Sequence, residues 1–367
     1  MYVHVPFCAR RCAYCDFSIA VRREVPVDEF ICGVERELDA RFADAKPWTV
    51  DTLYLGGGTP SRLGGDGVAR LIDVLRARIE LAPGAEVTLE ANPEDLSVDA
   101  ATRWRASGVN RISLGAQSFD DRVLTWMHRG HDAAAIVRAV DAARSAGFEN
   151  LSLDLIFSLP ESLDRSWERD VERALALAPA HLSLYGLTIE PHTPLGRWNA
   201  RGEVAESPDE RYEAEFMHAN RALVAAGFEH YEVSNFARPG RRARHNSAYW
   251  THVPYAGLGP SAHEFDGARR RWNAAPYADW VRRVGQNQDP LEGSEVLSAG
   301  DRTAEVVYLG LRTSAGLLLR DGERERVSRW MDAGWGEVGS DGRLRLSPAG
   351  WLRLDALAAD LTLVRSR

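Results

Sequence analysis

The sequence predicts an α/β fold in which six strand-helix units form a core, followed by a small domain of helices and a β-hairpin. Three observations support this prediction. From residue 1 to about residue 227, short apolar or β-branched runs alternate with longer helical stretches. Gly108, Gly147 and Gly227 each follow a predicted helix and precede an apolar residue, as expected where a helix ends just before a strand. After residue 227 the alternation stops. These patterns fit a partial or full (β/α) barrel, and they also fit a large doubly wound sheet.

The predicted strands are the short apolar runs of this alternation, at residues 2–5, 52–55, 87–90, 111–114, 151–155 and 182–185. Either architecture places the chemistry at the C-terminal ends of its strands, so the residues that follow these runs are the candidates for function. One helix start is also marked. Ser207 is followed by a proline and, three residues later, by Glu210, which predicts a capping box.

The rest of the chain divides into two further segments, so we predict domains at 1–227, 228–285 and 286–367. The middle segment is rich in arginine and aromatic residues and extends the core. The last segment predicts helices near 302–311 and 325–333 and a hairpin at 337–346, which is typical of a small winged-helix domain. Its arginines are mixed with acids and form no concentrated basic face, so we expect no nucleic-acid partner.

The composition is that of an ordinary globular protein: 367 residues, 45% of them hydrophobic, with a formal net charge of −8. No apolar run approaches the roughly 20 residues of a membrane-spanning helix, and the N-terminus lacks a signal-peptide layout. We therefore expect a cytoplasmic protein. Lys46 is the only lysine, which excludes a Walker A lysine and leaves no evident Schiff-base lysine.

Three of the four cysteines, Cys8, Cys12 and Cys15, lie within eight residues directly after the first predicted strand. In a cytoplasmic protein, such crowding indicates metal or redox chemistry rather than disulfides. Three thiolates leave one position of a [4Fe-4S] cluster open for a ligand. The alternative is a zinc site completed by His4 or Asp16. The fourth cysteine, Cys32, falls inside a predicted helix at 28–42, where we expect a small buried residue.

The stretch from Tyr2 to Phe17 resembles the cluster loop of radical S-adenosylmethionine (SAM) enzymes. It is most similar to the branch that contains oxygen-independent coproporphyrinogen III oxidase (HemN) and the heme chaperone HemW. The resemblance implies a partial (β/α)6 barrel of the TIM type with a small C-terminal winged-helix-like domain. It also implies a [4Fe-4S] cluster on Cys8, Cys12 and Cys15, with SAM on the fourth iron as the source of a 5′-deoxyadenosyl radical. Relatives are expected to carry a longer leader before the strand that begins here at Tyr2.

A glycine run, residues 56–58, follows the second predicted strand and leads into Thr59 and Pro60. A dinucleotide-binding fingerprint is excluded, because Ser61 stands where the third glycine should be and Pro60 removes an amide donor. Asp154 lies inside an otherwise apolar strand and therefore needs a partner or a role. By resemblance to the family, the residues that contact SAM are Tyr2, Gly58, Thr59, Glu90, Gln117, Arg129 and Asp154.

A second candidate site surrounds His245, Tyr249 and Trp250, which follow arginines 238, 241, 242 and 244 and precede the arginines at 269–271. Imidazole can ligate heme iron, aromatic rings stack on macrocycles, and arginines pair with propionates. A packed aromatic corner beside a solvated basic loop explains the same residues. The resemblance favours heme, because H-N-x-x-Y-W is similar to a pattern of HemW-like proteins. His263 is a weaker second candidate for contact with heme or substrate.

The resemblance implies a heme chaperone of the HemW type that delivers heme to respiratory or membrane hemoproteins. In this hypothesis the cluster and SAM order the protein or make it a homodimer. The alternative is an enzyme, an oxygen-independent coproporphyrinogen III oxidase that decarboxylates the porphyrin precursor. Phe17 argues against the oxidase, because it occupies the place of that branch's fourth cysteine.

Overall fold

The computed structural model describes residues 1–42 and 48–366, so Lys46 lies outside the described residues. The chain forms two compact units. Unit 1 contains residues 1–207 and 254–295, and unit 2 contains residues 208–253 and 296–367. The segment 228–285, predicted as a single extension of the core, is thus shared between the two units.

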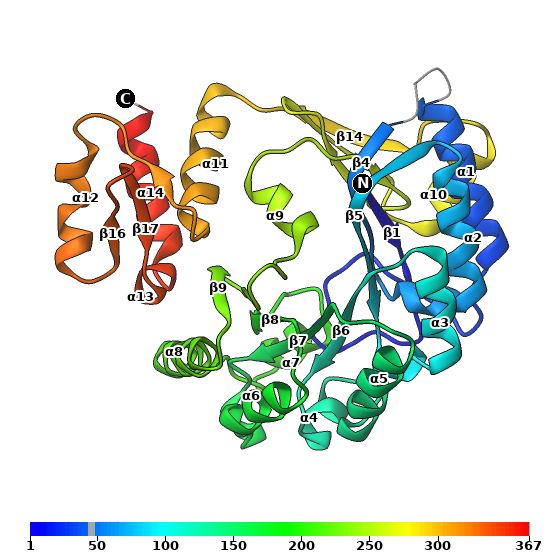
Figure 1. The fold of residues 1–367 in the computed structure, drawn as a ribbon, viewed down its shortest axis with the longest axis horizontal. Helices are drawn as coiled ribbons and strands as arrows, with labels where there is room; N and C mark the ends of the chain where they lie inside the picture. Colours follow the sequence, from blue (N-terminus) through cyan, green and yellow to red (C-terminus); the bar gives the residue numbers. More distant parts are fainter. Residues whose placement is uncertain (43–47, 367) are drawn as a thin grey trace. The chain divides into compact units, whose positions relative to one another are not determined.

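The core of unit 1 is a parallel sheet whose strands follow one another in chain order (Figure 1). Its strands are β1 (Tyr2–Val5), β4 (Trp48–Gly57), β5 (Ile79–Ala91), β6 (Arg111–Gln117), β7 (Leu151–Phe157) and β8 (His181–Gly186). All six predicted strands are confirmed, and β11 (Gly257–Leu258) pairs in parallel with the outer side of β1. A doubly wound sheet would reverse the strand order at its centre. Sequential order without reversal belongs to a partial barrel, so the structure decides between the two architectures.

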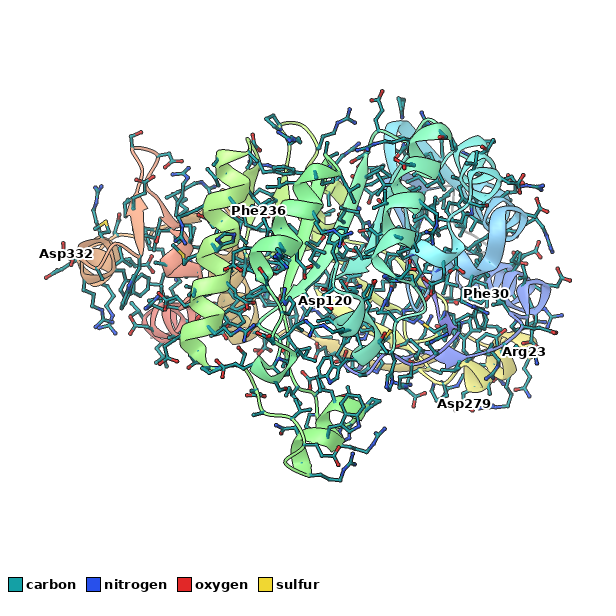
Figure 2. All side chains as sticks on the ribbon, turned by 90° about the horizontal axis from the view of Figure 1, so that it is seen from below. Arg23, Phe30, Asp120, Phe236, Asp279 and Asp332 are labelled. Atoms are coloured by element: carbon teal, nitrogen blue, oxygen red, sulfur yellow. The ribbon has the colours of Figure 1, made fainter. Side chains whose placement is uncertain are left out.

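The helices of unit 1 lie along the outer side of this sheet (Figure 1). They are α1 (Val27–Phe42), α2 (Gly64–Arg76), α3 (Val98–Ser107), α4 (Asp121–Trp126), α5 (Ala133–Ser145), α6 (Trp167–Ala176) and α10 (Tyr277–Gly285). The short helix α7 (Pro194–Ala200) lies instead against the cysteine loop, where the amide of Leu195 donates to the carbonyl of Ala13. Several begin at a side-chain cap; the Asp120 carboxylate at the start of α4, labelled in Figure 2, accepts hydrogen bonds from two backbone amides of the first turn. The predicted glycine stops are confirmed, since Gly108 and Gly147 adopt left-handed φ angles of 105° and 87°.

The buried face of α1 explains why one prediction is wrong. Phe30, labelled in Figure 2, lies on this face. Its ring packs against Phe7, with a centroid distance of 5.4 Å, and against Trp280, at 5.8 Å. The buried positions of the helix continue through Val34 and Leu38. Cys32 lies off this stripe and is exposed, not buried as predicted from its place in the helix. The error arose because helix membership alone does not specify which face a residue occupies.

Two small sheets complete unit 1. The strands β2 (Phe7–Cys8) and β3 (Ala20–Val21) pair in parallel around the cysteine loop. The strands β12 (His263–Phe265), β13 (Arg269–Asn273) and β14 (Leu291–Val296) form a separate three-stranded sheet. The parallel β2–β3 pair joins the two ends of the loop that carries the cysteines, and so fixes where that loop leaves the barrel.

Unit 2 contains the predicted C-terminal helices and hairpin. Its elements are α8 (Asp209–Ala225), β9 (Glu229–Glu232), β10 (Asn235–Ala237), α9 (Arg244–Trp250), α11 (Ala299–Arg312), β15 (Leu317–Leu318), α12 (Glu323–Asp332), β16 (Gly336–Val338), β17 (Arg343–Leu346), α13 (Pro348–Trp351) and α14 (Leu354–Arg365). The strands order as β15-β17-β16, all antiparallel, so helices followed by a β-ribbon are confirmed. The final helix α14 was not predicted.

The predicted capping box at the start of α8 is wrong. The N-cap residue is Pro208, which makes no side-chain cap, and the Ser207 hydroxyl oxygen is buried without a hydrogen-bond partner. The helix begins one residue later than the motif required, so the serine is out of register with the amides that it would cap. Among the helices of the described residues, none is both long enough and apolar enough to cross a membrane.

Candidate functional site

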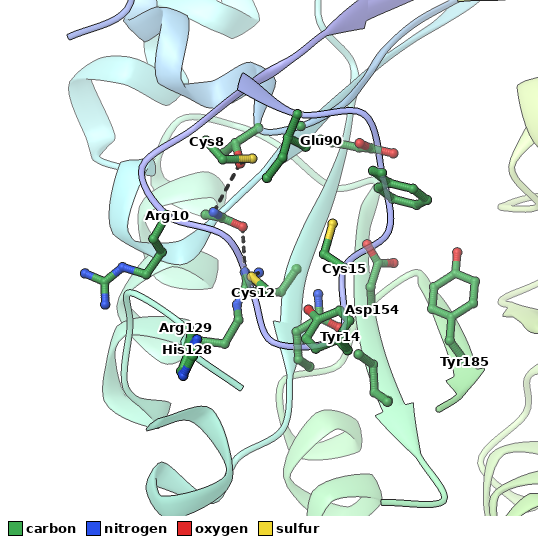
Figure 3. Close-up of a pocket in the computed structure, with 18 of the residues that line it drawn as sticks. Cys8, Arg10, Cys12, Tyr14, Cys15, Glu90, His128, Arg129, Asp154 and Tyr185 are labelled. Carbon is green, nitrogen blue, oxygen red and sulfur yellow. Dashed lines mark hydrogen bonds between the residues drawn. The ribbon is translucent and has the colours of Figure 1, made fainter. Parts of the chain in front are cut away.

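A cavity of about 440 Å³ lies at the C-terminal ends of the barrel strands in unit 1 (Figure 3). Every residue predicted to ligate the cluster or to contact SAM lines this cavity, except Tyr2. Those lining it are Cys8, Cys12, Cys15, Gly58, Thr59, Glu90, Gln117, Arg129 and Asp154. These residues come from six separate segments of the chain, and parallel strands in sequential order bring their ends to one place.

The cysteine loop is anchored by backbone hydrogen bonds on both sides of Ala13. The amide of Ala13 donates to the carbonyl of Met127 at 3.0 Å, and its carbonyl accepts from the amide of Leu195 at 2.8 Å. Burial raises the pKa of the Cys8 thiol, and it raises the pKa of Cys15 to about 11. Coordination to iron supplies the positive charge that removes such protons, so the loop suits thiolate ligands of a metal centre.

The geometry does not favour the alternative zinc site. Within residues 1–42 and 48–366, no group of three or more His, Cys, Asp or Glu side chains is arranged to hold a single metal ion. His4 is buried, its Nδ1 lies 3.0 Å from the Tyr2 hydroxyl, and its Nε2 lies 3.0 Å from the Ser18 carbonyl. Both ring nitrogens are thus engaged. Thiols that do not converge on one point suit a cubane cluster, in which each cysteine binds a different iron atom.

A chain of hydrogen bonds connects two of the cysteines across the cavity (Figure 3). The sulfur of Cys8 lies 3.3 Å from the Thr59 hydroxyl, which accepts from the Asn92 side-chain amide at 3.5 Å. The Asn92 oxygen accepts from Arg129 at 2.6 Å, and a second guanidinium nitrogen of Arg129 donates to the sulfur of Cys12 at 3.3 Å. The threonine and the arginine were predicted, whereas Asn92 was not. Its position two residues after Glu90, at the end of a strand, was the only available signal.

Arg129 supplies the buried positive charge of the cavity. Burial by itself would lower the pKa of this guanidinium, but neighbouring Tyr14 and Cys12 raise it above its usual value. Its Nη2 also donates to the carbonyl of Gly115 at 2.9 Å, while its Nε is buried without a hydrogen-bond partner. A permanent charge with an unused donor, in a cavity lined by three thiols, fits a carboxylate-bearing ligand such as SAM.

Two carboxylates lie deeper in the same cavity. Glu90 accepts from the Tyr54 hydroxyl at 2.7 Å and from the Gly57 amide at 3.0 Å. Burial, with the nearby charge of Asp154, raises the pKa of Glu90 to about 7 despite these hydrogen bonds. Asp154 has the partners that its place in an apolar strand required, since Ser113 donates to both of its oxygens at 3.1 Å. Burial still raises the pKa of Asp154.

Gln117 ends β6 in the left-handed region, with a φ angle of 65°. Such a conformation is costly for a residue other than glycine and is concentrated at functional sites. The neighbouring Gly115 explains how the side chain fits, because a Cβ at that position would lie 3.0 Å from the Gln117 amide nitrogen and 3.2 Å from Arg129. The end of β6 is therefore shaped around the predicted SAM contacts.

Two glycines of the run at residues 56–58 are required by the packing of the chain itself, whether or not a ligand is bound. A Cβ at Gly58 would lie 2.6 Å from the carbonyl carbon and oxygen of Pro6, and Gly57 adopts a φ angle of 109° beside the His4 ring. These glycines let β4 approach the strand that leads into the cysteine loop. Tyr2 does not line the cavity; its ring stacks on Tyr54 at 6.1 Å, so it contacts a partner of Glu90.

The heme candidates lie in unit 2, on the short helix α9. His245 is only 2% exposed, and its Nε2 lies 2.8 Å from the Tyr249 hydroxyl. The guanidinium carbon of Arg312 lies 4.2 Å from the centre of the Trp250 ring, and the indole nitrogen is buried without a hydrogen-bond partner. These contacts show a packed aromatic corner whose imidazole already has a hydrogen-bond partner.

The arginines near this helix are partly used within the fold. Arg238 donates to the carbonyl of Ala226 at 2.7 Å, and Arg242 pairs with Glu229 at 2.9 Å. The second arginine run, on β13, belongs to unit 1, where Arg271 donates to Asp289. His263 is an exposed residue of β12 whose ring stacks on Trp272 at 5.9 Å.

Phe17 lines the cavity of unit 1 and is 60% exposed.

Comparison with known proteins identifies the family. Residues 2–174 match the radical SAM superfamily. The heme chaperone HemW of Mycobacterium tuberculosis is 38% identical over 367 residues, which cover 98% of this chain and 94% of that protein. The chain belongs to the HemW family. The HemW of Escherichia coli is 39% identical over 329 residues, covering 85% of this chain and 86% of that protein.

The predicted fold is confirmed by a solved structure outside the HemW family. Coproporphyrinogen III oxidase (HemN) from Escherichia coli, described as a radical SAM enzyme, superposes with a TM-score of 0.81 at 22% identity. The match covers 99% of this chain and 89% of that chain, and it shows the fold alone. Membership of the radical SAM superfamily implies a [4Fe-4S] cluster and SAM, and the cavity of this HemW family member holds the residues that suit them.

Proposed function

We propose that this protein is a heme chaperone that carries a [4Fe-4S] cluster and SAM, binds heme and delivers it to hemoproteins. The observation that supports the proposal is its similarity to HemW proteins over 98% of the chain. The cavity agrees with it, since it is lined by three thiols, and Phe17 stands where the oxidase branch has a fourth cysteine. We also propose a cytoplasmic location and acceptors among respiratory or membrane hemoproteins.

The cavity residues divide into three groups with different tasks. Cys8, Cys12 and Cys15 would hold the cluster, which supplies an open iron site for the amino acid end of SAM. Arg129 presents its buried charge and unused Nε to a carboxylate. Glu90 and Asp154 would accept hydrogen bonds from the hydroxyl groups of the ligand. Gln117 and Thr59 line the same cavity. Tyr2 would act through Tyr54 and Glu90 rather than by direct contact.

We propose that heme binds beside α9, with His245 as an axial ligand and Tyr249 and Trp250 against the macrocycle. Nε2 of His245 is the atom that iron would use, and it now lies against the Tyr249 hydroxyl. Heme binding therefore exchanges this hydrogen bond for a bond to iron. The loss of this hydrogen bond within α9 lowers the net affinity for heme. A lower affinity suits a protein that must release the heme it carries.

One anaerobic experiment separates the chaperone from the oxidase. The cluster-reconstituted protein is incubated with SAM, a strong reductant and coproporphyrinogen III, and mass spectrometry measures decarboxylated porphyrin and 5′-deoxyadenosine. We expect no decarboxylated product, together with transfer of bound heme to apomyoglobin in a parallel sample. Catalytic formation of decarboxylated porphyrin would overturn the proposal in favour of the oxidase. Gel filtration of the same samples with and without cluster and SAM tests the proposed homodimer.

A further inference from the structure

His131 makes hydrogen bonds to two segments that border the cavity, the one after β5 and the end of β6. It lies in the loop between α4 and α5, and its side chain is fully buried. Its Nδ1 lies 3.1 Å from Oε2 of Glu94, and its Nε2 lies 3.2 Å from the carbonyl oxygen of Ala116. Glu94 follows the end of β5 and lines the cavity, and Ala116 immediately precedes the last residue of β6.

Both partners of this imidazole are hydrogen-bond acceptors. A backbone carbonyl can only accept, and an ionised carboxylate can only accept. A neutral imidazole has one N–H and can satisfy only one of them, whereas an imidazolium donates to both. The surroundings of Glu94 favour its ionised form: burial would raise its pKa, but the hydrogen bond from His131 and the charge of Arg129 hold the pKa below its usual value.

We propose that His131 is an imidazolium paired with Glu94, and that this pair is a positioning element that clamps the end of β6 so that Gln117 faces the SAM site. The inference deepens the proposed function, because it rests on SAM binding in this cavity. It does not depend on heme.

The end of β6 needs such a clamp. Gln117 has a left-handed backbone, and a strained residue of this kind persists only where its neighbours are fixed. On one side, the Ala116 carbonyl is held by His131. On the other side, Asp170 accepts from the Ser118 hydroxyl at 2.8 Å and from the Phe119 amide at 2.7 Å. The strained residue is therefore anchored immediately before and after.

A second residue of the same loop, Arg129, connects the same two strand ends. Arg129 donates to the Gly115 carbonyl and to Asn92, so it joins β6 to the loop after β5 just as His131 joins Ala116 to Glu94. Gly130 lies between the two, and a Cβ at this position would displace the Glu94 carboxylate from its place beside His131. Two adjacent cations thus tie the same two strand ends together. The charged groups that face the imidazole are Glu94 and, beyond it, Arg129 and Asp95.

The first test reads the protonation of the ring directly. The ring nitrogens of the ¹⁵N-histidine-labelled full chain are observed by NMR near neutral pH, and the His131 signals are assigned by their loss in His131→Gln. We expect two protonated nitrogens in the unsubstituted protein. In Glu94→Gln we expect only one, because the carboxylate that stabilises the imidazolium is gone. A single protonated nitrogen in the unsubstituted protein would overturn the proposal. This readout needs neither the cluster nor SAM.

The second test measures SAM affinity of the cluster-reconstituted protein by equilibrium dialysis over a pH series. We expect His131→Gln to weaken SAM binding about tenfold while iron content stays unchanged. Because Glu90 titrates near neutral pH in both proteins, their affinities are compared at each pH, and the ratio of the two gives the contribution of His131. The exposed His192, replaced by Gln, is the matched control.

The outcomes of the second test separate the clamp from the proposed function. Equal SAM affinity in His131→Gln and the unsubstituted protein would remove His131 from its positioning role while leaving the chaperone intact. No SAM binding by the unsubstituted protein would contradict the proposed cofactor site itself, and the NMR result would still decide the charge of His131.

Discussion

Nη1 of Arg129 lies 3.3 Å from the sulfur of Cys12, a residue 117 positions earlier in the chain. This contact joins the cysteine loop to the strand ends that form the rest of the cavity. Since the same guanidinium also donates to Asn92 and to the Gly115 carbonyl, one buried cation connects three segments. One chain of hydrogen bonds therefore joins two proposed cluster ligands, Cys8 and Cys12, to two proposed SAM contacts, Thr59 and Arg129. We expect a substitution at either pair to affect binding at the other.

Replacing Cys8, Cys12 or Cys15 singly by alanine should abolish most of the iron and sulfide bound after reconstitution, because two thiolates cannot hold the cluster. Elemental analysis and visible absorption measure the loss. The matched control is Cys32→Ala, since Cys32 is exposed and lies away from the cavity lining. Loss of the cluster in that control, or its retention in the other three, would contradict the assigned ligands.

Arg129→Met should weaken SAM binding by roughly ten- to a hundredfold, because it removes a charged donor from the cavity. Equilibrium dialysis with labelled SAM gives the affinity. Arg138, whose side chain is 69% exposed, provides the control Arg138→Met, for which we expect no change. If the two variants bound SAM equally well, Arg129 would have only a structural role.

The raised pKa of Glu90, about 7, makes a prediction about stability. The ordinary value is 4.5, so the folded state binds this proton more tightly than the unfolded state does. The free energy of unfolding of the cofactor-free protein should therefore fall as pH rises from 4.5 through 7, and the contribution of Glu90 should then stay constant. The difference is roughly 3 kcal/mol. Urea unfolding of the protein and of Glu90→Gln across this range measures it.

Glu90→Gln should remove the part of the pH dependence that belongs to Glu90. The carboxyl of Glu37 also has a raised pKa and remains in both proteins, so its contribution cancels. Asp154 interacts with Glu90, so the comparison measures Glu90 together with its effect on Asp154. Parallel curves for the two proteins would show that folding does not raise the pKa of Glu90.

Gly58→Ala should destabilise the protein by about 1–3 kcal/mol and lower its cluster content, because the new methyl group meets the Pro6 backbone, which cannot rotate away. Gly285→Ala is the control. Its Cβ would lie 3.6 Å from the flexible Arg36 side chain, within α10, and it should be neutral or slightly stabilising. Thermal unfolding compares the two. Equal stability would mean that β4 can shift without cost.

His245→Ala should weaken heme binding while leaving the absorption of the cluster unchanged, because α9 and the cysteine loop belong to different units. Tyr249→Phe should act in the opposite direction and raise heme affinity by about fivefold, since it removes the hydroxyl that competes with iron for Nε2. Heme titration followed by absorption measures both. Unchanged affinity in His245→Ala would exclude His245 as a ligand.

The strands and most of the site could be predicted because their signals are local. Apolar runs between helical stretches define β1 and β4 to β8, and the ligands follow those runs directly. Cys32 and Ser207 were mispredicted for a shared reason: each prediction used a short pattern without the register of the helix around it. Asn92 and His131 were missed because an isolated polar residue after a strand or in a loop carries no pattern of its own.

The sequence by itself determined the chemistry of this protein: three thiols after the first strand, a carboxylate in an apolar strand and an aromatic stretch with one histidine. Tertiary structure decided which of these groups meet. Strand order made a partial barrel rather than a doubly wound sheet, because pairing between strands depends on the whole chain. It also decided the protonation of Glu90 and the two acceptors of His131, because burial and the geometry of hydrogen bonds exist only after distant segments have come together.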